Sequence, residues 1–216
     1  MPESEIAILV ADDHAVVRRG LKEIIREQLE GTIVFYDAAS AAETIAVLRE
    51  NRIDLVLLDI SLPDNNGLEL LKTIKAEYPG LAVLVISIYG EDQFALRAFQ
   101  AGAAGYLTKD SAPDDLYGAV KKILDGDRYL SHAFCELLLA SADGTPETAK
   151  PLHSLLSVRE WQVARMLTAG TPIKSISALL ELSEKTISTY RTRILEKLQI
   201  RSNAELVSYF IYHKLT

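Results

Sequence analysis

The sequence predicts an α/β domain built on a doubly wound parallel sheet, followed by a smaller all-α domain of four helices. Five short apolar, β-favouring runs alternate with longer segments of helical periodicity over the first 130 residues. After a polar stretch at 141–153, which contains two prolines and a glycine, only helical periodicity follows. We therefore expect an α/β domain over 1–130, a helix and linker over 131–153, and a helical domain over 154–216.

Charge separates the same two parts of the chain. Residues 1–151 carry 14 Lys and Arg against 25 Asp and Glu, a net charge of −11, whereas residues 152–216 carry 9 against 5, a net charge of +4. The pI of about 5.2 for the whole chain hides this basic excess. A local basic excess keeps nucleic acid among the candidate partners of the second domain.

Composition excludes several other classes of protein. The chain has 216 residues, of which 49% are hydrophobic and 25% charged, which is typical of folded globular proteins. Its apolar runs are far shorter than the roughly 18 residues of a membrane span. The acidic start at Met1–Glu5 lacks the basic region of a signal peptide, and the single Cys135 cannot form an internal disulfide. We expect a cytoplasmic protein that does not enter a membrane.

Each predicted strand of the first domain is a short run rich in branched apolar residues. The five runs are Ile6–Val10, Ile33–Tyr36, Leu55–Leu58, Val83–Ile86 and Tyr106–Thr108. Helical crossovers between strands that are buried on both faces favour a flavodoxin-like (βα)5 fold with strand order 2-1-3-4-5. In that order strands 1, 3, 4 and 5 are neighbours, so their carboxyl ends meet at one edge of the sheet.

Polar residues follow these four strands and no comparable set follows the second. They are Asp12 and Asp13, Asp59, Ser87 and Lys109. A single Asp at a strand end is more often a helix N-cap, but five such positions at four neighbouring strand ends favour a site. Grouped carboxylates repel one another unless a cation compensates. Mg²⁺ suits oxygen ligands of this kind, and a hydroxyl and an ammonium suit a phosphoryl group.

Other chemistries lack their characteristic residues. An aspartate-based phosphatase would carry a second acid two residues after Asp59, where this chain has Ser61. The sequence has no GxxxxGK[ST] loop and no GxGxxG turn after the first strand, so nucleotide binding is not indicated. His14 follows the acid pair at the start of a helix, and we assign it no role beyond local structure. We expect a protein that is not an enzyme.

With these motifs, residues 1 to about 130 resemble the receiver domain of a bacterial two-component response regulator. The matching segments are Ala11–His14, Leu57–Pro63 with Gly67, Ser87, and Tyr106–Lys109. The resemblance implies that Asp59 is the phosphoacceptor. It further implies that Asp13, Asp59 and the Ser61 carbonyl bind Mg²⁺ directly, that Asp12 does so through water, and that Lys109 pairs with the phosphoryl group. Ser87 and Tyr106 are then the residues that respond to phosphorylation.

Helix signals in the second domain are closely spaced. Ser157 and Glu160 form a capping box ahead of the first helix, and Gly170 ends it. Thr171 and Pro172 suit the N-cap and N1 positions of a second helix. A third helix begins after Ser183 with an inward stripe of Ile187, Ile194, Leu195 and Leu198, and a second capping box, Ser202–Glu205, starts the last helix. Two helices joined by a tight turn, the second with a basic exposed face, indicate a helix-turn-helix.

Residues Leu156 to about Tyr209 resemble the LuxR-type helix-turn-helix domain of NarL/FixJ response regulators. The segments that carry the likeness are Leu156–Glu160, Ala169–Gly170 with Lys174, Leu182–Ile187, Leu195–Leu198 and Arg201–Leu206. Helical spacing places Lys185, Ser188, Thr189 and Thr192 on the face that would enter the major groove. Lys174, Arg193 and Lys197 are expected to contact phosphates. Several relatives carry Lys where this chain has Ser188 and Thr192, so direct base readout is expected to be weaker or more dependent on water.

The two resemblances together imply a phosphorylation-controlled transcription regulator. A sensor histidine kinase would phosphorylate Asp59, and a homodimer would then bind a two-fold site in double-stranded DNA, with RNA polymerase as a further candidate partner. The apolar last helix fits dimerisation and core packing equally well. The alternative is a signalling adaptor whose helical domain binds a protein. A LuxR-type activator that senses a small molecule is disfavoured, because the acidic set occupies the place of its ligand cavity.

Overall fold

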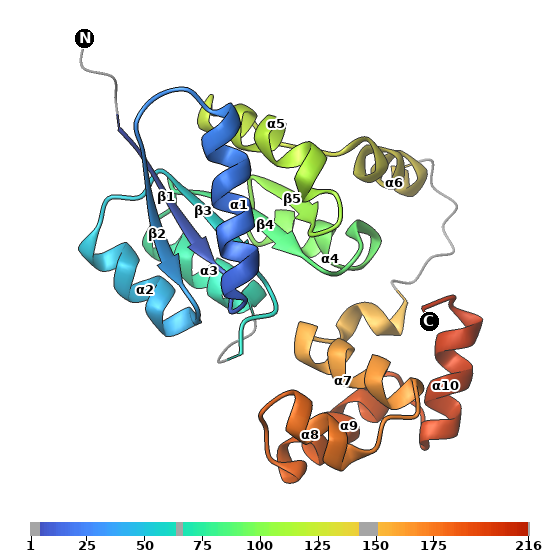
Figure 1. Ribbon diagram of the computed structural model, residues 1–216. Coiled ribbons are helices and arrows are strands. Elements are labelled where there is room, and N and C mark those ends of the chain that lie inside the picture. The colour runs from blue at the N-terminus through green and yellow to red at the C-terminus, as the bar shows by residue number, and fades with distance from the viewer. Residues whose placement is uncertain (1–4, 64–66, 143–150, 216) are drawn as a thin grey trace. The chain divides into compact units, whose positions relative to one another are not determined.

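The computed structural model describes residues 5–63, 67–142 and 151–215. The chain divides into two compact units, residues 1–144 and 145–216, which are an α/β unit and a helical unit (Figure 1). The predicted fold class is therefore confirmed. Among the residues that the structure describes, the helices are all too short or too polar to cross a membrane.

The first unit is built on a five-stranded parallel sheet in the predicted order, β2-β1-β3-β4-β5. Its strands are β1 (Ile6–Ala11), β2 (Ile33–Ala38), β3 (Leu55–Asp59), β4 (Ala82–Ser87) and β5 (Gly105–Thr108). Each is one or two residues longer than the apolar run that predicted it, and β3 and β4 extend to the polar residues Asp59 and Ser87. Asp59 lies opposite Ile86, and Ser87 lies opposite Thr108.

Helices cover both faces of this sheet (Figure 1). They are α1 (Ala15–Gln28), α2 (Ala41–Glu50), α3 (Gly67–Glu77), α4 (Glu91–Gln100) and α5 (Ala112–Leu124). Helices α1 and α5 pack together on one face, where Leu21 and Ile25 meet Leu116 and Val120 in the core. Because helices cover both faces of the sheet, the strands consist almost entirely of apolar residues. All five residues of β3 are buried.

Helix α6 (His132–Ala142) lies within the first unit. The Phe134 ring stacks on Phe99 of α4 with centroids 4.9 Å apart. Ser131 accepts a hydrogen bond from the Phe134 backbone N–H at 3.0 Å and donates one to Glu91, so it fastens the start of α6 to α4. Within the expected linker over 141–153, residues 141–142 belong to α6 and residues 152–153 belong to a 3-10 helix, η1 (Leu152–Leu155). Residues 143–150 of that prediction lie outside the described residues.

The second unit packs its helices around one core. They are α7 (Val158–Thr168), α8 (Ile173–Leu179), α9 (Glu184–Lys197) and α10 (Asn203–Tyr212). Trp161 and Phe210 are buried at its centre with ring centroids 5.5 Å apart. The predicted stripe on α9 is confirmed, since Ile187, Ile194, Leu195 and Leu198 are at most 7% exposed.

Helix starts in this unit follow the sequence signals with two exceptions. The Ser157–Glu160 capping box and the Ser183 cap are present. Pro172 itself is the N-cap of α8, with extended backbone at ψ 147°, so Thr171 lies one residue outside the cap. Ser202 caps α10, but Glu205 accepts from the backbone N–H of Arg201 instead of Ser202. The second capping box is therefore incomplete.

Candidate functional site

Two buried carboxylates and one ammonium meet at the carboxyl edge of the sheet. Asp12, just after β1, and Asp59, at the end of β3, are each 2% exposed. The Lys109 Nζ lies 2.6 Å from Asp12 Oδ2 and 2.7 Å from Asp59 Oδ2. The Lys109 backbone N–H donates to the Ser87 carbonyl at 2.7 Å, which holds the end of β5 against β4. The structure thus brings together residues from four strand ends, as the strand order requires.

Burial and the neighbouring charges act on Asp59 in opposite directions. Removal from water raises the pKa of Asp59, the Lys109 ammonium and the Ser61 backbone N–H lower it, Asp12 raises it, and the net pKa lies above 3.8. Burial lowers the pKa of Lys109, but Asp59 and Asp12 raise it by more, so Lys109 stays charged. The edge therefore holds one ammonium between two carboxylates and favours further positive charge.

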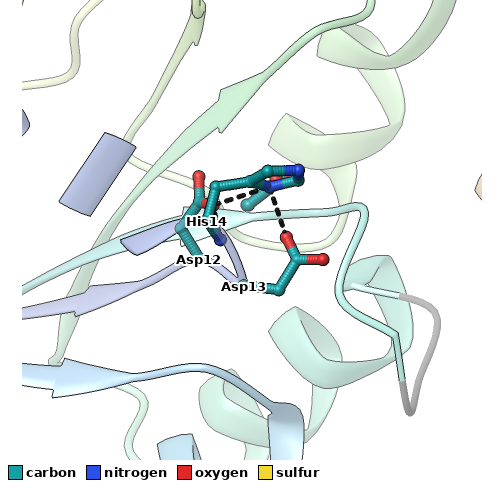
Figure 2. Close-up of side chains that lie close together, drawn as sticks. Asp12, Asp13 and His14 are labelled. Carbon is teal, nitrogen blue, oxygen red and sulfur yellow. Dashed lines mark hydrogen bonds and ion pairs between the residues drawn. The ribbon is translucent and has the colours of Figure 1, made fainter. Parts of the chain in front are cut away.

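Asp13 and His14 lie beside Asp12 (Figure 2), and their side chains are 33% and 65% exposed. The His14 Nδ1 lies 2.7 Å from Asp13 Oδ1 and 3.3 Å from Asp12 Oδ1, and the His14 backbone N–H donates to Asp12 Oδ1 at 2.7 Å. One ligand atom each of Asp12, Asp13, His14 and Asp59 lie within 4.8 Å of one another. No role beyond local structure was predicted for His14, although its position directly after two acids was a signal. Asp37 of β2 lies apart and pairs with Lys22 at 2.6 Å.

The turn after β3 is fixed by its backbone. Ser61 donates its N–H to Asp59 Oδ1 at 2.8 Å, which orients the carboxylate. The Gly67 N–H donates to the Ile60 carbonyl at 3.2 Å. A Cβ at Gly67 would lie 2.2 Å from the Ile60 Cα, so only glycine lets α3 begin this close to the residue that follows Asp59.

Ser87 and Tyr106 are buried behind the carboxylates. Ser87 has no exposed surface, and its hydroxyl accepts from the Tyr89 N–H at 3.1 Å. Tyr106 is 2% exposed and donates its hydroxyl proton to the Tyr89 carbonyl at 2.9 Å. Burial raises the pKa of Tyr106, so it remains a hydrogen-bond donor at neutral pH. The Tyr106 ring lies inward, in the core.

Helix α9 presents the predicted polar face to solvent. Lys185, Ser188, Thr189 and Thr192 are all exposed. The three hydroxyls donate to carbonyls one turn earlier in their own helix, at 2.9 to 3.1 Å, so each oxygen keeps the capacity to accept from a base. Lys185 and Thr189 line a shallow hollow together with Thr186, Tyr190 and Arg193.

The three lysine and arginine residues expected at phosphates differ in their surroundings. Lys174 on α8 and Arg193 on α9 are exposed. The Lys197 Nζ lies 2.5 Å from Glu160 Oε2, and the Glu160 side chain is 4% exposed. Glu160 also accepts from the Ser157 N–H at 2.7 Å. Lys197 therefore joins the end of α9 to the start of α7, a structural contact that spacing along the helix does not reveal.

Comparison with known families decides the assignment. Residues 8–121 match the response regulator receiver domain, and residues 154–210 match the LuxR family of bacterial regulatory proteins. The chain is a NarL/FixJ-type response regulator. It is 34% identical over 210 residues to the response regulator UvrY of Escherichia coli K12, covering 97% of this chain and 95% of UvrY. It is 36% identical over 208 residues to the response regulator GacA of Pseudomonas aeruginosa, covering 96% of each.

Solved structures of RcsB share the fold of this response regulator. RcsB from Salmonella enterica serovar Typhimurium, bound to promoter rprA in the presence of the phosphomimetic BeF₃⁻, has a TM-score of 0.60 and 24% identity, over 94% of this chain and 98% of that one. Another structure holds two RcsB dimers on two parallel DNAs, with a TM-score of 0.59 and 24% identity over 96% and 98%. The two family matches show that the response regulator is a receiver joined to a LuxR-type DNA-binding domain, and its family regulates transcription.

Proposed function

We propose that phosphorylation of Asp59 controls DNA binding by this response regulator. The observation that carries the proposal is the Lys109 ammonium lying between the buried Asp59 and Asp12 carboxylates. An Asp59 oxygen attacks the phosphorus of a phosphohistidine on a sensor kinase. The phosphorus–nitrogen bond breaks, the imidazole leaves with a proton from solvent, and an acyl phosphate remains. Lys109 then pairs with a phosphoryl oxygen.

The residues at this edge suit Mg²⁺. Asp13, Asp59 and the Ser61 carbonyl are the proposed direct ligands, with Asp12 acting through water. Three carboxylates face one nearby ammonium, so the cluster keeps an excess of negative charge and presents only hard oxygen atoms from these residues. When bound, the ion neutralises charge on the phosphoryl oxygens. Lys109 and the Ser61 N–H hold the Asp59 carboxylate in place for the transfer.

Ser87 and Tyr106 are the proposed responding residues. Phosphorylation adds about 1.5 to 2 negative charges and three acceptor oxygens beside them. Ser87 ends β4 at the same edge of the sheet, and its hydroxyl accepts a hydrogen bond from the Tyr89 N–H. Tyr106 donates a hydrogen bond to the carbonyl of Tyr89, two residues before α4. Displacement of Ser87 toward the acyl phosphate therefore shifts the segment that carries Tyr89 and α4, which changes the receiver surface.

The DNA-binding face is assigned to α9. Lys185, Ser188, Thr189 and Thr192 are proposed to face bases, and Lys174, Arg193 and Lys197 to contact phosphates. The exposed hydroxyl oxygens accept from the amino groups of adenine or cytosine, and the threonine methyl groups contact thymine. One donor of Lys197 is taken by Glu160 and two remain. The phosphorylated form is proposed to bind a two-fold site as a homodimer. The side chains of Ile211 and Tyr212 on α10, which are 62% and 81% exposed, support this proposal because they offer apolar surface for a second copy.

Retention of a randomised duplex DNA pool tests the proposal. The purified chain is mixed with the pool and Mg²⁺, with and without a small phosphodonor, and the retained DNA is sequenced. We expect a two-fold motif enriched with the phosphodonor, no such enrichment for Asp59→Ala, and normal enrichment for Asp37→Asn, which removes a carboxylate outside the cluster.

The other outcomes separate the alternatives. Equal enrichment of the motif without the phosphodonor would support DNA binding by this chain but reject its control by phosphorylation of Asp59. No enrichment, with retention that does not fall as salt rises, would favour the adaptor, because DNA affinity depends steeply on salt.

A further inference from the structure

We propose that His14 is a ligand of the divalent ion at the acidic cluster. The site would then bind transition-metal ions such as Mn²⁺ and Co²⁺ more tightly, relative to Mg²⁺, than its carboxylates alone would allow. This inference rests on the proposed metal site of Asp12, Asp13 and Asp59, and adds one nitrogen ligand to it.

The distances around His14 fit neighbouring positions on an octahedral ion. With bonds of about 2.1 Å, adjacent ligand atoms are about 3.0 Å apart and opposite ones about 4.2 Å. The His14 Nδ1 lies 2.7 Å from Oδ1 of Asp13, one of the proposed direct ligands, which is close to the adjacent spacing. One ligand atom each of Asp13, His14 and Asp59 lie within 4.8 Å of one another, so these three need to move together by only about half an ångström to bind one ion directly, with Asp12 beside them acting through water.

The backbone holds the imidazole at the cluster. His14 is the N-cap residue of α1, its N–H donates to Asp12 Oδ1, and its carbonyl accepts from the Arg18 N–H at 3.1 Å. Its side chain makes no capping bond and is turned toward the carboxylates of Asp12 and Asp13 (Figure 2). The side chain is 65% exposed, so an ion reaches it from solvent without opening the fold.

Lys109 and His14 use different oxygens of the cluster. Lys109 lies against Oδ2 of both Asp12 and Asp59, whereas His14 lies against Oδ1 of Asp12 and Oδ1 of Asp13. An ion on the His14 side therefore leaves the Lys109 contacts intact. Lys109 remains available for the phosphoryl group.

An imidazole nitrogen changes which ion the site prefers. Mg²⁺ takes hard oxygen ligands and gives up its waters reluctantly. For a site of given nitrogen and oxygen ligands, affinity rises along the first transition row from Mn²⁺ through Co²⁺ to Cu²⁺. Exchange of one water for the His14 nitrogen thus favours Mn²⁺ and Co²⁺ with little effect on Mg²⁺.

Metal titration of the full chain tests this inference. Binding of MgCl₂, MnCl₂ and CoCl₂ is measured separately by calorimetry, and bound Mn²⁺ is examined by pulsed electron paramagnetic resonance for coupling to ¹⁴N. For His14→Ala we expect affinity for Mn²⁺ and Co²⁺ to fall about tenfold or more, affinity for Mg²⁺ to change less than about threefold, and the ¹⁴N coupling to disappear. His132→Ala removes an imidazole that is 89% exposed on α6 and should change none of these.

His14→Gln separates a ligand from a hydrogen-bonding partner. The amide keeps a donor for Asp13 but has no imidazole nitrogen, so we expect it to behave like His14→Ala. Equal losses for all three ions, or no ¹⁴N coupling in the unmodified chain, would reject the role of His14 and leave the carboxylate site standing. If none of the ions binds and Asp13→Asn changes nothing, the metal site of the proposed function fails as well.

Discussion

Gly67→Ala is expected to destabilise the receiver unit by about 3 kcal/mol. The new Cβ would lie 2.2 Å from the Ile60 Cα and 2.7 Å from both the carbonyl carbon and oxygen of Ile60, whereas ordinary contacts begin near 3.4 Å. These are backbone atoms, so no side chain can rotate away and α3 must move by about 1 Å from the β3 end. Overpacking of this kind costs about 1–3 kcal/mol or more, and helix propensity returns at most about 1 kcal/mol.

Thermal unfolding of the full chain measures this effect one unit at a time. Trp161 is the single tryptophan and is buried in the helical unit, so its emission follows that unit, while circular dichroism at 222 nm follows both. We expect the midpoint temperature of the receiver transition to fall by on the order of 10 °C. The midpoint temperature reported by Trp161 should stay unchanged.

Gly118→Ala is the matched control for Gly67→Ala. Gly118 lies on the exposed side of α5, where a Cβ would meet nothing within 4 Å. The same substitution there should stabilise the receiver by about 0.5–1 kcal/mol. A Gly67→Ala chain as stable as the unmodified one would refute the close approach of α3 to Ile60.

Three further predictions follow from the two sites. Asp59→Asn, measured without divalent ions, should stabilise the receiver at pH 7.5, because a group whose pKa is raised by folding makes the folded state less stable as the pH rises through that pKa. The gain in stability should shrink toward pH 4. A lower stability of Asp59→Asn at pH 7.5 would show that attraction to Lys109 outweighs the cost of burying the Asp59 carboxylate. Lys197→Ala should lower the stability reported by Trp161 by about 1–3 kcal/mol, because it leaves the buried Glu160 carboxylate without its cation, whereas Lys185→Ala at an exposed position should change it by less than about 0.5 kcal/mol. Thr189→Ala should leave folding unchanged, since its hydroxyl bonds only within α9, and should alter the retained DNA motif, whereas Arg193→Ala should weaken binding to all duplexes and reduce the salt slope by about 0.9.

The positions of the strand ends could be predicted from sequence because short apolar runs and segments of helical periodicity are easy to tell apart. Alternation of short apolar runs with helical segments implies a parallel sheet, and the strand order then places Asp12, Asp59, Ser87 and Lys109 at one edge. Neither step needs the direction of any side chain. The same holds for the inward stripe of α9, which follows from a period of 3.6 residues.

Residues whose surroundings depend on distant parts of the chain were harder to predict. His14 faces the acids because of the backbone angles at the α1 N-cap, which periodicity does not encode. Lys197 was placed on the correct helix, but its partner Glu160 is 37 residues away. The packing of α6 on the receiver depends on Phe134 meeting Phe99, a contact that local composition around 131–142 could not indicate.

The separation in sequence between Lys109 and its two carboxylate partners determines when this site becomes complete during synthesis. Asp12 and Asp59 pair with an ammonium 97 and 50 residues further along the chain. A nascent chain that has formed β1, β3 and β4 holds two neighbouring carboxylates without the cation that offsets their repulsion. Closure of the site therefore coincides with addition of the segment that carries β5, the last strand of the sheet, and Lys109.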